Sequence, residues 1–206
     1  MKKVILLFFV ALCTFGAQAQ ELKYGVTAGM NVSKPSNYDS RIGFNVGAKG
    51  EMSFENNIYA GVGLTLSSKG RKSVGFYDSA TKTGATWNTT PYYLEVPVYV
   101  GYKAPITENV KLFGNVGPYI GVGLFGKSKV TNEVAGKKSD KTINNVFKDK
   151  VQERFDWGFG ANVGVEFCNH YQLSLGYSLG MKNIYKKNTN LDSKNRVFNI
   201  SFAYMF

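Results

Sequence analysis

The sequence predicts an all-β protein, an eight-stranded antiparallel up-and-down transmembrane β-barrel. First, apolar and polar residues alternate over segments longer than the ~5–6 residues of an average strand. Second, no stretch after Gln20 holds the ~18 uncharged apolar residues that a membrane helix needs. Third, short and long connections follow one another between the alternating segments, which is typical of outer-membrane barrels.

The alternation is clearest in the last third of the chain. Between Phe155 and Phe167 every odd position is apolar, and every even position is Asp, Gly, Asn or Glu. The same criterion predicts eight strands in all. They are Lys23–Ser33, Arg41–Glu55, Ile58–Ser68, Tyr92–Lys103, Val110–Phe125, Phe155–Phe167, Tyr171–Met181 and Val197–Phe206.

The connections between these strands differ in length. Three are tight, at 56–57, 104–109 and 169–170, and four are longer, at 34–40, 69–91, 126–154 and 182–195. The even number of strands permits closure. We expect both ends of the mature chain to lie on the short-turn side, in the periplasm.

Side-chain size predicts which face of each strand points outward. One face is bulky and apolar, whereas the other is rich in Gly, Asn, Ser and Thr, which suit a crowded eight-stranded interior. A solvent face so rich in glycine would weaken a soluble sheet. We therefore expect the apolar face to meet lipid. Aromatic girdles are expected at the outer rim (Tyr92, Phe155, Trp157) and the inner rim (Tyr24, Tyr102, Phe167, Tyr171, Tyr204, Phe206), although aromatic residues also favour strands in general.

The N-terminus has the pattern of a signal peptide over residues 1–19. Lys2 and Lys3 precede an apolar run, and a small-x-small cleavage site follows at 17–19. Residues 20–206 then form one outer-membrane β-barrel domain. A lipoprotein reading through Cys13 is disfavoured by the bulky Leu12 before it.

Cleavage removes two lysines and lowers the formal charge from +11 to +9. An exported basic chain meets lipid phosphates and acidic surface sugars first, so we expect membrane lipid and lipopolysaccharide as partners and no nucleic acid. Only Cys168 remains after processing, and no intramolecular disulfide can form.

Charged residues on the inward faces predict an interior network. An unpaired charge in a low-dielectric interior is costly, so charges of both signs should pair and hold the barrel closed. A gated ion path through the same residues is the alternative. The predicted network contains Lys49, Glu51, Glu95, Lys103, Lys111, Asp156 and Glu166.

Little in the sequence points to catalysis, a cofactor or a metal. The only histidine, His170, falls in a tight turn at the predicted periplasmic rim and cannot build a usual metal site with Cys168. The glycine-rich tract 121–126 lacks the following helix that a phosphate-binding loop needs. We expect no enzymatic activity.

Two long connections carry charges that could meet a ligand. One contains Lys129, Lys137, Lys138, Lys141, Lys148 and Lys150, and the other contains Arg71, Lys72, Phe76, Tyr77 and Trp87. A solvated loop is the plain interpretation. Contact with lipopolysaccharide phosphates or an acidic partner is the sharper hypothesis.

Three segments resemble a known family. Residues 24–33 (YGVTAGMNVS), 63–70 (GLTLSSKG) and 93–98 (YLEVPV) are similar to the PorT-like or "porin family" of small outer-membrane β-barrel proteins. The resemblance implies an eight-stranded barrel in the outer membrane. The last strand also resembles the signal read by the barrel-assembly machinery, through Phe202, Tyr204 and Phe206.

The functional expectation is an integral outer-membrane protein that acts as a closed structural or interaction scaffold. Its outer loops would contact lipopolysaccharide, an extracellular ligand or another envelope protein. A narrow channel for small solutes or ions is the alternative. An eight-stranded barrel is too tight for the wide aqueous pore of a 16-stranded porin.

Overall fold

The computed structural model describes residues 21–36, 39–78, 81, 83–135, 137–147, 152–184 and 193–206. The signal peptide predicted at 1–19 lies outside the described residues. Within them the chain is all-β apart from a 3-10 turn at Glu55–Asn57. No helix in this described part is long and apolar enough to cross a membrane.

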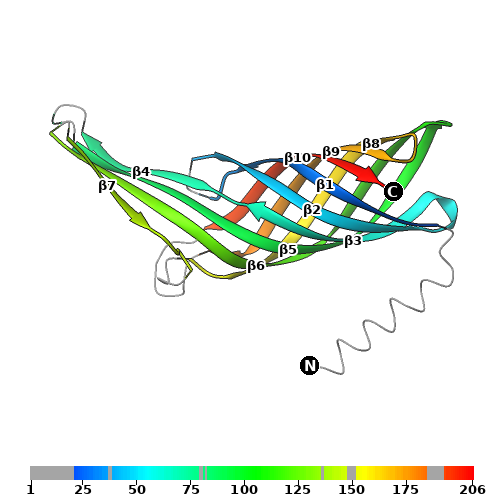
Figure 1. The fold of residues 1–206 in the computed structure, drawn as a ribbon, viewed down its shortest axis with the longest axis horizontal. Coiled ribbons are helices and arrows are strands. Elements are labelled where there is room, and N and C mark those ends of the chain that lie inside the picture. Colours follow the sequence, from blue (N-terminus) through cyan, green and yellow to red (C-terminus); the bar gives the residue numbers. More distant parts are fainter. Residues whose placement is uncertain are drawn as a thin grey trace, which may run out of the picture.

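The described strands form one antiparallel sheet (Figure 1). They are β1 (Glu21–Ser33), β2 (Arg41–Ser53), β3 (Ile58–Ser68), β4 (Arg71–Asp78), β5 (Thr83–Thr107), β6 (Val110–Val134), β7 (Lys137–Ile143), β8 (Phe155–Phe167), β9 (Tyr171–Asn183) and β10 (Lys194–Met205). The pairings run β1-β2-β3-β5-β6-β8-β9-β10 and return from β10 to β1, so eight of the described strands form a ring. The predicted antiparallel up-and-down arrangement is confirmed.

Two of the predicted long connections, 69–91 and 126–154, are wrong in extent, because each of them contains β-strand. β5 begins at Thr83 and β6 continues to Val134, and both project beyond the ring at the end away from the C-terminus (Figure 1). β4 pairs with the projecting part of β5, and β7 with that of β6. We call this four-stranded sheet, made of β4, 83–91, 126–134 and β7, the extension.

The extension escaped the sequence criterion for a physical reason. Alternation marks a strand only where its two faces meet different surroundings. In β7 every side chain from Lys137 to Thr142 is exposed, and only Ile143 is partly covered. Its composition is therefore polar on both faces, like that of a loop.

The tight turns lie at the end of the ring opposite the extension, which we call the short-turn end. Asn56 and Asn57 adopt φ values of 59° and 63°, and Cys168 and Asn169 adopt 50° and 60°. Asparagine tolerates this left-handed region better than most residues. The β5–β6 connection is shorter than the predicted 104–109, since β5 runs to Thr107.

The apolar faces point outward, as predicted. On β9 the odd side chains from Tyr171 to Met181 are exposed, whereas Gln172 and Gly176 on the other face are buried. Every strand of the ring exposes large apolar side chains; examples are Val26, Phe44, Leu64, Val100, Val116, Phe159, Leu175 and Ile200. The outer wall is therefore an apolar belt, and the polar residues fill the interior.

Aromatic rings gather at both ends of this belt. At the short-turn end Tyr24 stacks on Phe206 with centroids 5.3 Å apart, and Tyr171 lies 5.3 Å from Tyr204. At the extension end the rings of Tyr92 and Phe125 stack at 4.7 Å. Phe125 was not among the residues predicted for the outer girdle.

Candidate functional site

The interior near the short-turn end holds a group of charges that we call the short-turn cluster. Lys103 on β5 lies at its centre, with Nζ 2.8 Å from Oε2 of Glu51 and 2.6 Å from Oε2 of Glu166. Both carboxylate side chains are almost fully buried, at 2% and 1% exposure. Gln172 Nε2 donates to the same two oxygens at 3.1 and 2.7 Å. One cation and one amide thus join two carboxylates from β2 and β8.

Two further lysines surround this centre. Lys49 Nζ lies 3.1 Å from Oε1 of Glu51 and also donates to Gln172. Lys111 is more exposed and lies 4.0 Å from Glu166. Tyr99 donates its hydroxyl to Glu51 at 3.3 Å. The three lysines and two glutamates leave a formal charge of +1.

A second group, the long-loop cluster, closes the interior toward the extension. Lys69 is buried and makes ion pairs with Glu95 and with Asp156, the latter at 3.0 Å. The ring of Tyr119 lies 4.4 Å from Lys69 Nζ. Asn195 Nδ2 donates to Asp156 at 2.9 Å. One lysine and two carboxylates leave a formal charge of −1 here, opposite to that of the short-turn cluster.

The mouth of the ring beside this cluster is covered by residues 146, 147 and 152, which lie between β7 and β8. Val146 and Phe147 are buried against Tyr93. Gln152 accepts a hydrogen bond from Arg71 Nη1 and donates one to the Tyr93 hydroxyl, both at 2.8 Å. An apolar contact and a polar bridge therefore fix this segment over the opening.

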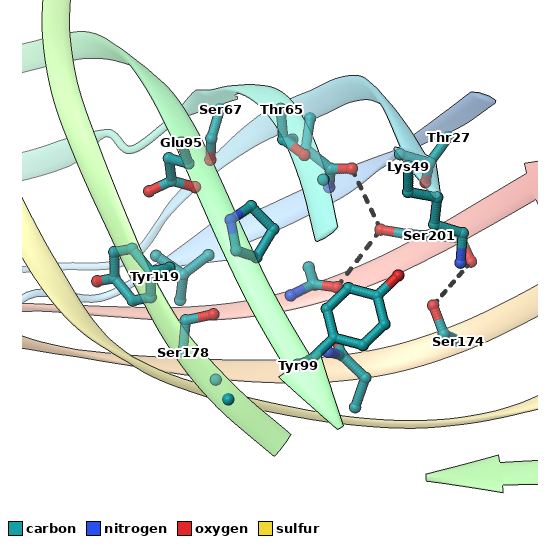
Figure 2. Close-up of a pocket in the computed structure, with 18 of the residues that line it drawn as sticks. Thr27, Lys49, Thr65, Ser67, Glu95, Tyr99, Tyr119, Ser174, Ser178 and Ser201 are labelled. Atoms are coloured by element: carbon teal, nitrogen blue, oxygen red, sulfur yellow. Dashed lines mark hydrogen bonds between the residues drawn. The ribbon is translucent and has the colours of Figure 1, made fainter. Parts of the chain in front are cut away.

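Between the two clusters lies a polar cavity of about 160 Å³ (Figure 2). Figure 2 shows Thr65, Ser201 and Tyr99 around it, with Glu95 at one end. Asparagines join the strands along its wall: Asn45 donates to Asn31 at 2.7 Å, and Asn162 to Asn115 at 2.8 Å. A polar cavity of this kind suits ordered water.

All seven charged residues predicted for the interior lie there, but in two separate groups. The short-turn cluster collects Lys49, Glu51, Lys103, Lys111 and Glu166, whereas Glu95 and Asp156 belong to the long-loop cluster.

Lys69 is not among the residues predicted for the interior, because the predicted connection 69–91 begins with it. Lys69 continues the odd, inward face of Thr65 and Ser67, so extending the alternation by one position would have found it. Gln172 and Gln152 carry no charge and gave no signal.

The three residues of the predicted assembly signal lie on the outer wall at the closing seam. Phe202 and Phe206 are exposed, and Tyr204 lies 5.1 Å from Phe206, centroid to centroid. The last strand ends at Met205 and not at Phe206, which corrects the predicted boundary. Phe206 still pairs with the first strand, because its backbone N–H donates to Tyr24 O at 2.7 Å.

His170 and Cys168 share the turn between β8 and β9. Cys168 is an exposed free thiol, and His170 Nδ1 lies 2.6 Å from the Cys168 carbonyl oxygen. In the described part of the chain no three His, Cys, Asp or Glu side chains are grouped to hold a metal.

Comparison with known proteins gives one family match. The model of the outer membrane protein beta-barrel domain matches residues 17–186, which is most of the chain. No curated protein matches the sequence. Among solved structures, the chain is similar to Ail, the attachment invasion locus protein of Yersinia pestis, at 17% identity and a TM-score of 0.44 (91% of this chain and 100% of that one). It is also similar to Neisserial surface protein A, at 16% identity and a TM-score of 0.45 (90% and 97%).

Proposed function

The chain belongs to the family of the outer membrane protein beta-barrel domain, and from this premise we propose that it is a closed transmembrane scaffold of the outer membrane. The observation that carries the proposal is the ring of eight strands with an apolar outer wall and an interior filled by paired charges. Apolar side chains on every strand of the ring would be costly in water and are favourable in lipid.

The lengths of the connections at the two ends of the ring indicate the direction in which the barrel is inserted. We place the short-turn end and both ends of the mature chain in the periplasm, with the extension outside the cell. Short periplasmic turns and longer external connections are the rule for such barrels. The exposed, charged strand β7 suits contact with lipopolysaccharide or another envelope protein. Residues 1–19 would direct export, and Phe202, Tyr204 and Phe206 would engage the barrel-assembly machinery.

Two layers of interior contacts support a closed barrel. The short-turn cluster and the long-loop cluster each cross the interior: the first links β2 with β8, and the second links Lys69, just after β3, with β8. Phe147 and Val146 cover the mouth beyond them. A hydrated ion crossing the barrel would have to break buried ion pairs, and removing a partner from such a pair costs ~3–5 kcal/mol.

Single-channel recording in planar bilayers tests this proposal. The purified protein, refolded and checked by heat-modifiable migration on a gel, should show no discrete conductance at neutral pH. A stable conductance that changes when Glu95 or Lys103 is substituted would overturn the closed scaffold and favour a narrow channel. The polar cavity between the clusters is the observation that keeps the channel as second candidate.

We further propose that the protein is not an enzyme and that it falls in the PorT-like group of its family. His170 lies in the β8–β9 turn, far along the barrel from the long-loop cluster, which supports the first point. The segment 93–98 supports the second, and its Glu95 pairs with Lys69 of the segment 63–70.

A further inference from the structure

Besides the interior cavity, the protein has a second hollow, which lies on the outer wall where the extension meets the barrel. It is an open groove with a volume of about 730 Å³, formed by β2, β5, β6 and β7. Its lining is Arg41, Asn88, Thr90, Tyr92, Phe125, Lys127, Lys129 and Thr142. Three of these residues are cations and none is a carboxylate. A closed scaffold has no need of such a groove.

A bulge places the lysines on this face. Opposite Tyr92 and Tyr93, the pairing of β6 skips from Phe125 to Gly123. Below the bulge the even residues of β6, such as Val122, are exposed, whereas above it the odd residues Lys127 and Lys129 are exposed. The extra residue therefore turns two cations to the same side as the apolar belt.

The cations are not neutralised equally. Arg41 lines the groove, and its Nη1 is buried without a hydrogen-bond partner among the described residues. Lys127 is exposed and makes no ion pair with any residue in the described ranges. Lys129 pairs with Asp140 at 2.7 Å. Lys127 is thus an exposed cation available to an anion, Arg41 brings a nitrogen with no hydrogen-bond partner among the described residues to the lining, and Lys129 could exchange partners.

Aromatic rings form the floor toward the belt. The rings of Phe44 and Tyr92 lie 5.9 Å apart, and those of Tyr92 and Phe125 lie 4.7 Å apart. Leu124 and Val122 continue this surface along β6. The groove is therefore amphipathic along the barrel axis, with cations on the side of the extension and apolar surface on the side of the belt.

We propose that this groove binds the phosphate of an outer-leaflet lipid, with the phosphorylated glucosamine lipid of lipopolysaccharide as its occupant. Arg41 and Lys127 contact the phosphate, Thr90 and Asn88 offer hydrogen bonds, and the rings of Tyr92 and Phe125 pack against the sugar and the first acyl carbons. Guanidinium and ammonium groups are the usual partners of phosphate. A soluble anion needs only the charges, whereas the adjoining aromatic floor favours a lipid.

This inference rests on the proposed function, because a lipid reaches the groove only if the belt lies in the membrane with the extension outside. The test uses the mature protein in nanodiscs of phosphatidylcholine, titrated with diphosphoryl lipid A. Substituting Arg41→Gln and Lys127→Gln together should weaken binding at least tenfold, because both basic groups proposed to contact the phosphate lose their charge. Tyr92→Ser should weaken lipid A binding as well.

Matched controls separate the possible outcomes. Lys34→Gln with Lys194→Gln removes the same charge from two exposed side chains outside the groove, one just after β1 and one on β10, and should leave binding unchanged. Dephosphorylated lipid A should bind at least tenfold more weakly than the diphosphoryl form. Equal binding of both lipids, equal loss in the two double variants, or displacement by inorganic phosphate at the lipid's own concentration would overturn the site. A protein that inserts and shifts on a gel yet fails these tests leaves the scaffold standing, whereas failure to insert refutes the scaffold.

Discussion

Replacing Lys103 by methionine removes the cation that joins the two most buried carboxylates of the interior. Methionine keeps most of the side-chain length, so the change is largely one of charge. Glu51 and Glu166 would then face each other across the space that Nζ occupied, 2.8 and 2.6 Å from their Oε2 atoms. We expect a large loss of stability with the strand pairing unchanged.

The contacts around Lys103 set the size of the effect. Removing one partner of a buried ion pair costs ~3–5 kcal/mol. Lys49 remains 3.1 Å from Glu51, and Gln172 still donates to both carboxylates, so partial compensation persists. The expected cost is therefore near the lower limit, about 3 kcal/mol. Adding Glu51→Gln and Glu166→Gln should recover most of it, because neutral amides need no cation.

Urea unfolding in lipid vesicles measures this cost, with tryptophan fluorescence as the signal, to which Trp157 on the outer wall and Trp87 on β5 both contribute. Lys111→Met is the control, because Lys111 is partly exposed and lies 4.0 Å from Glu166. We expect it to cost less than ~1 kcal/mol, as exposed pairs do. If Lys103→Met costs no more than Lys111→Met, or if the triple variant recovers nothing, the short-turn cluster does not stabilise the barrel.

Three other predictions concern the apolar outer wall, the pairing of β1 with β10 that closes the ring, and the covered mouth of the ring. Leu175→Lys places a charge on the belt and should cost ~2–4 kcal/mol in a bilayer, measured by urea unfolding, since a midplane lysine is unfavourable. Deleting Phe206 removes a backbone bond and two ring contacts at the seam and should slow assembly, followed by the heat-modifiable band over time; wild-type kinetics would contradict this. Gly123→Val would overlap the Phe147 ring and should expel it, raising tryptic cleavage at Arg154 in the folded protein.

Each of these changes has its own control. Leu22→Lys lies on the same wall near the rim, where a lysine should cost only ~0–1 kcal/mol. Phe198→Ala removes an exposed ring of the last strand far from its end and should leave the assembly rate near that of wild type. Gly114→Val adds a side chain where the nearest atoms are 3.8 Å away, and tryptic cleavage at Arg154 should not change.

The inward charges show how far sequence reasoning reached into the candidate site. Alternation alone placed Glu51, Lys103 and Glu166 on inward faces, because their neighbours two residues away are small or polar. It could not show which strands face each other across the interior, so it treated the charges as one network. The separation into two clusters depends on the register of β3 against β5 and of β6 against β8.

The sequence by itself determined the all-β fold class, the number of eight strands in the ring and the outward direction of the apolar faces. Each of these follows from a period-two pattern, which is a local property of the chain. Only the tertiary structure decided that Lys69 pairs with Glu95 and Asp156, that Phe147 covers the mouth, and that Arg41 meets Lys127 in one groove. These residues come together through strand register, a bulge and a folded-back connection. Such long-range geometry leaves no periodic trace in the sequence.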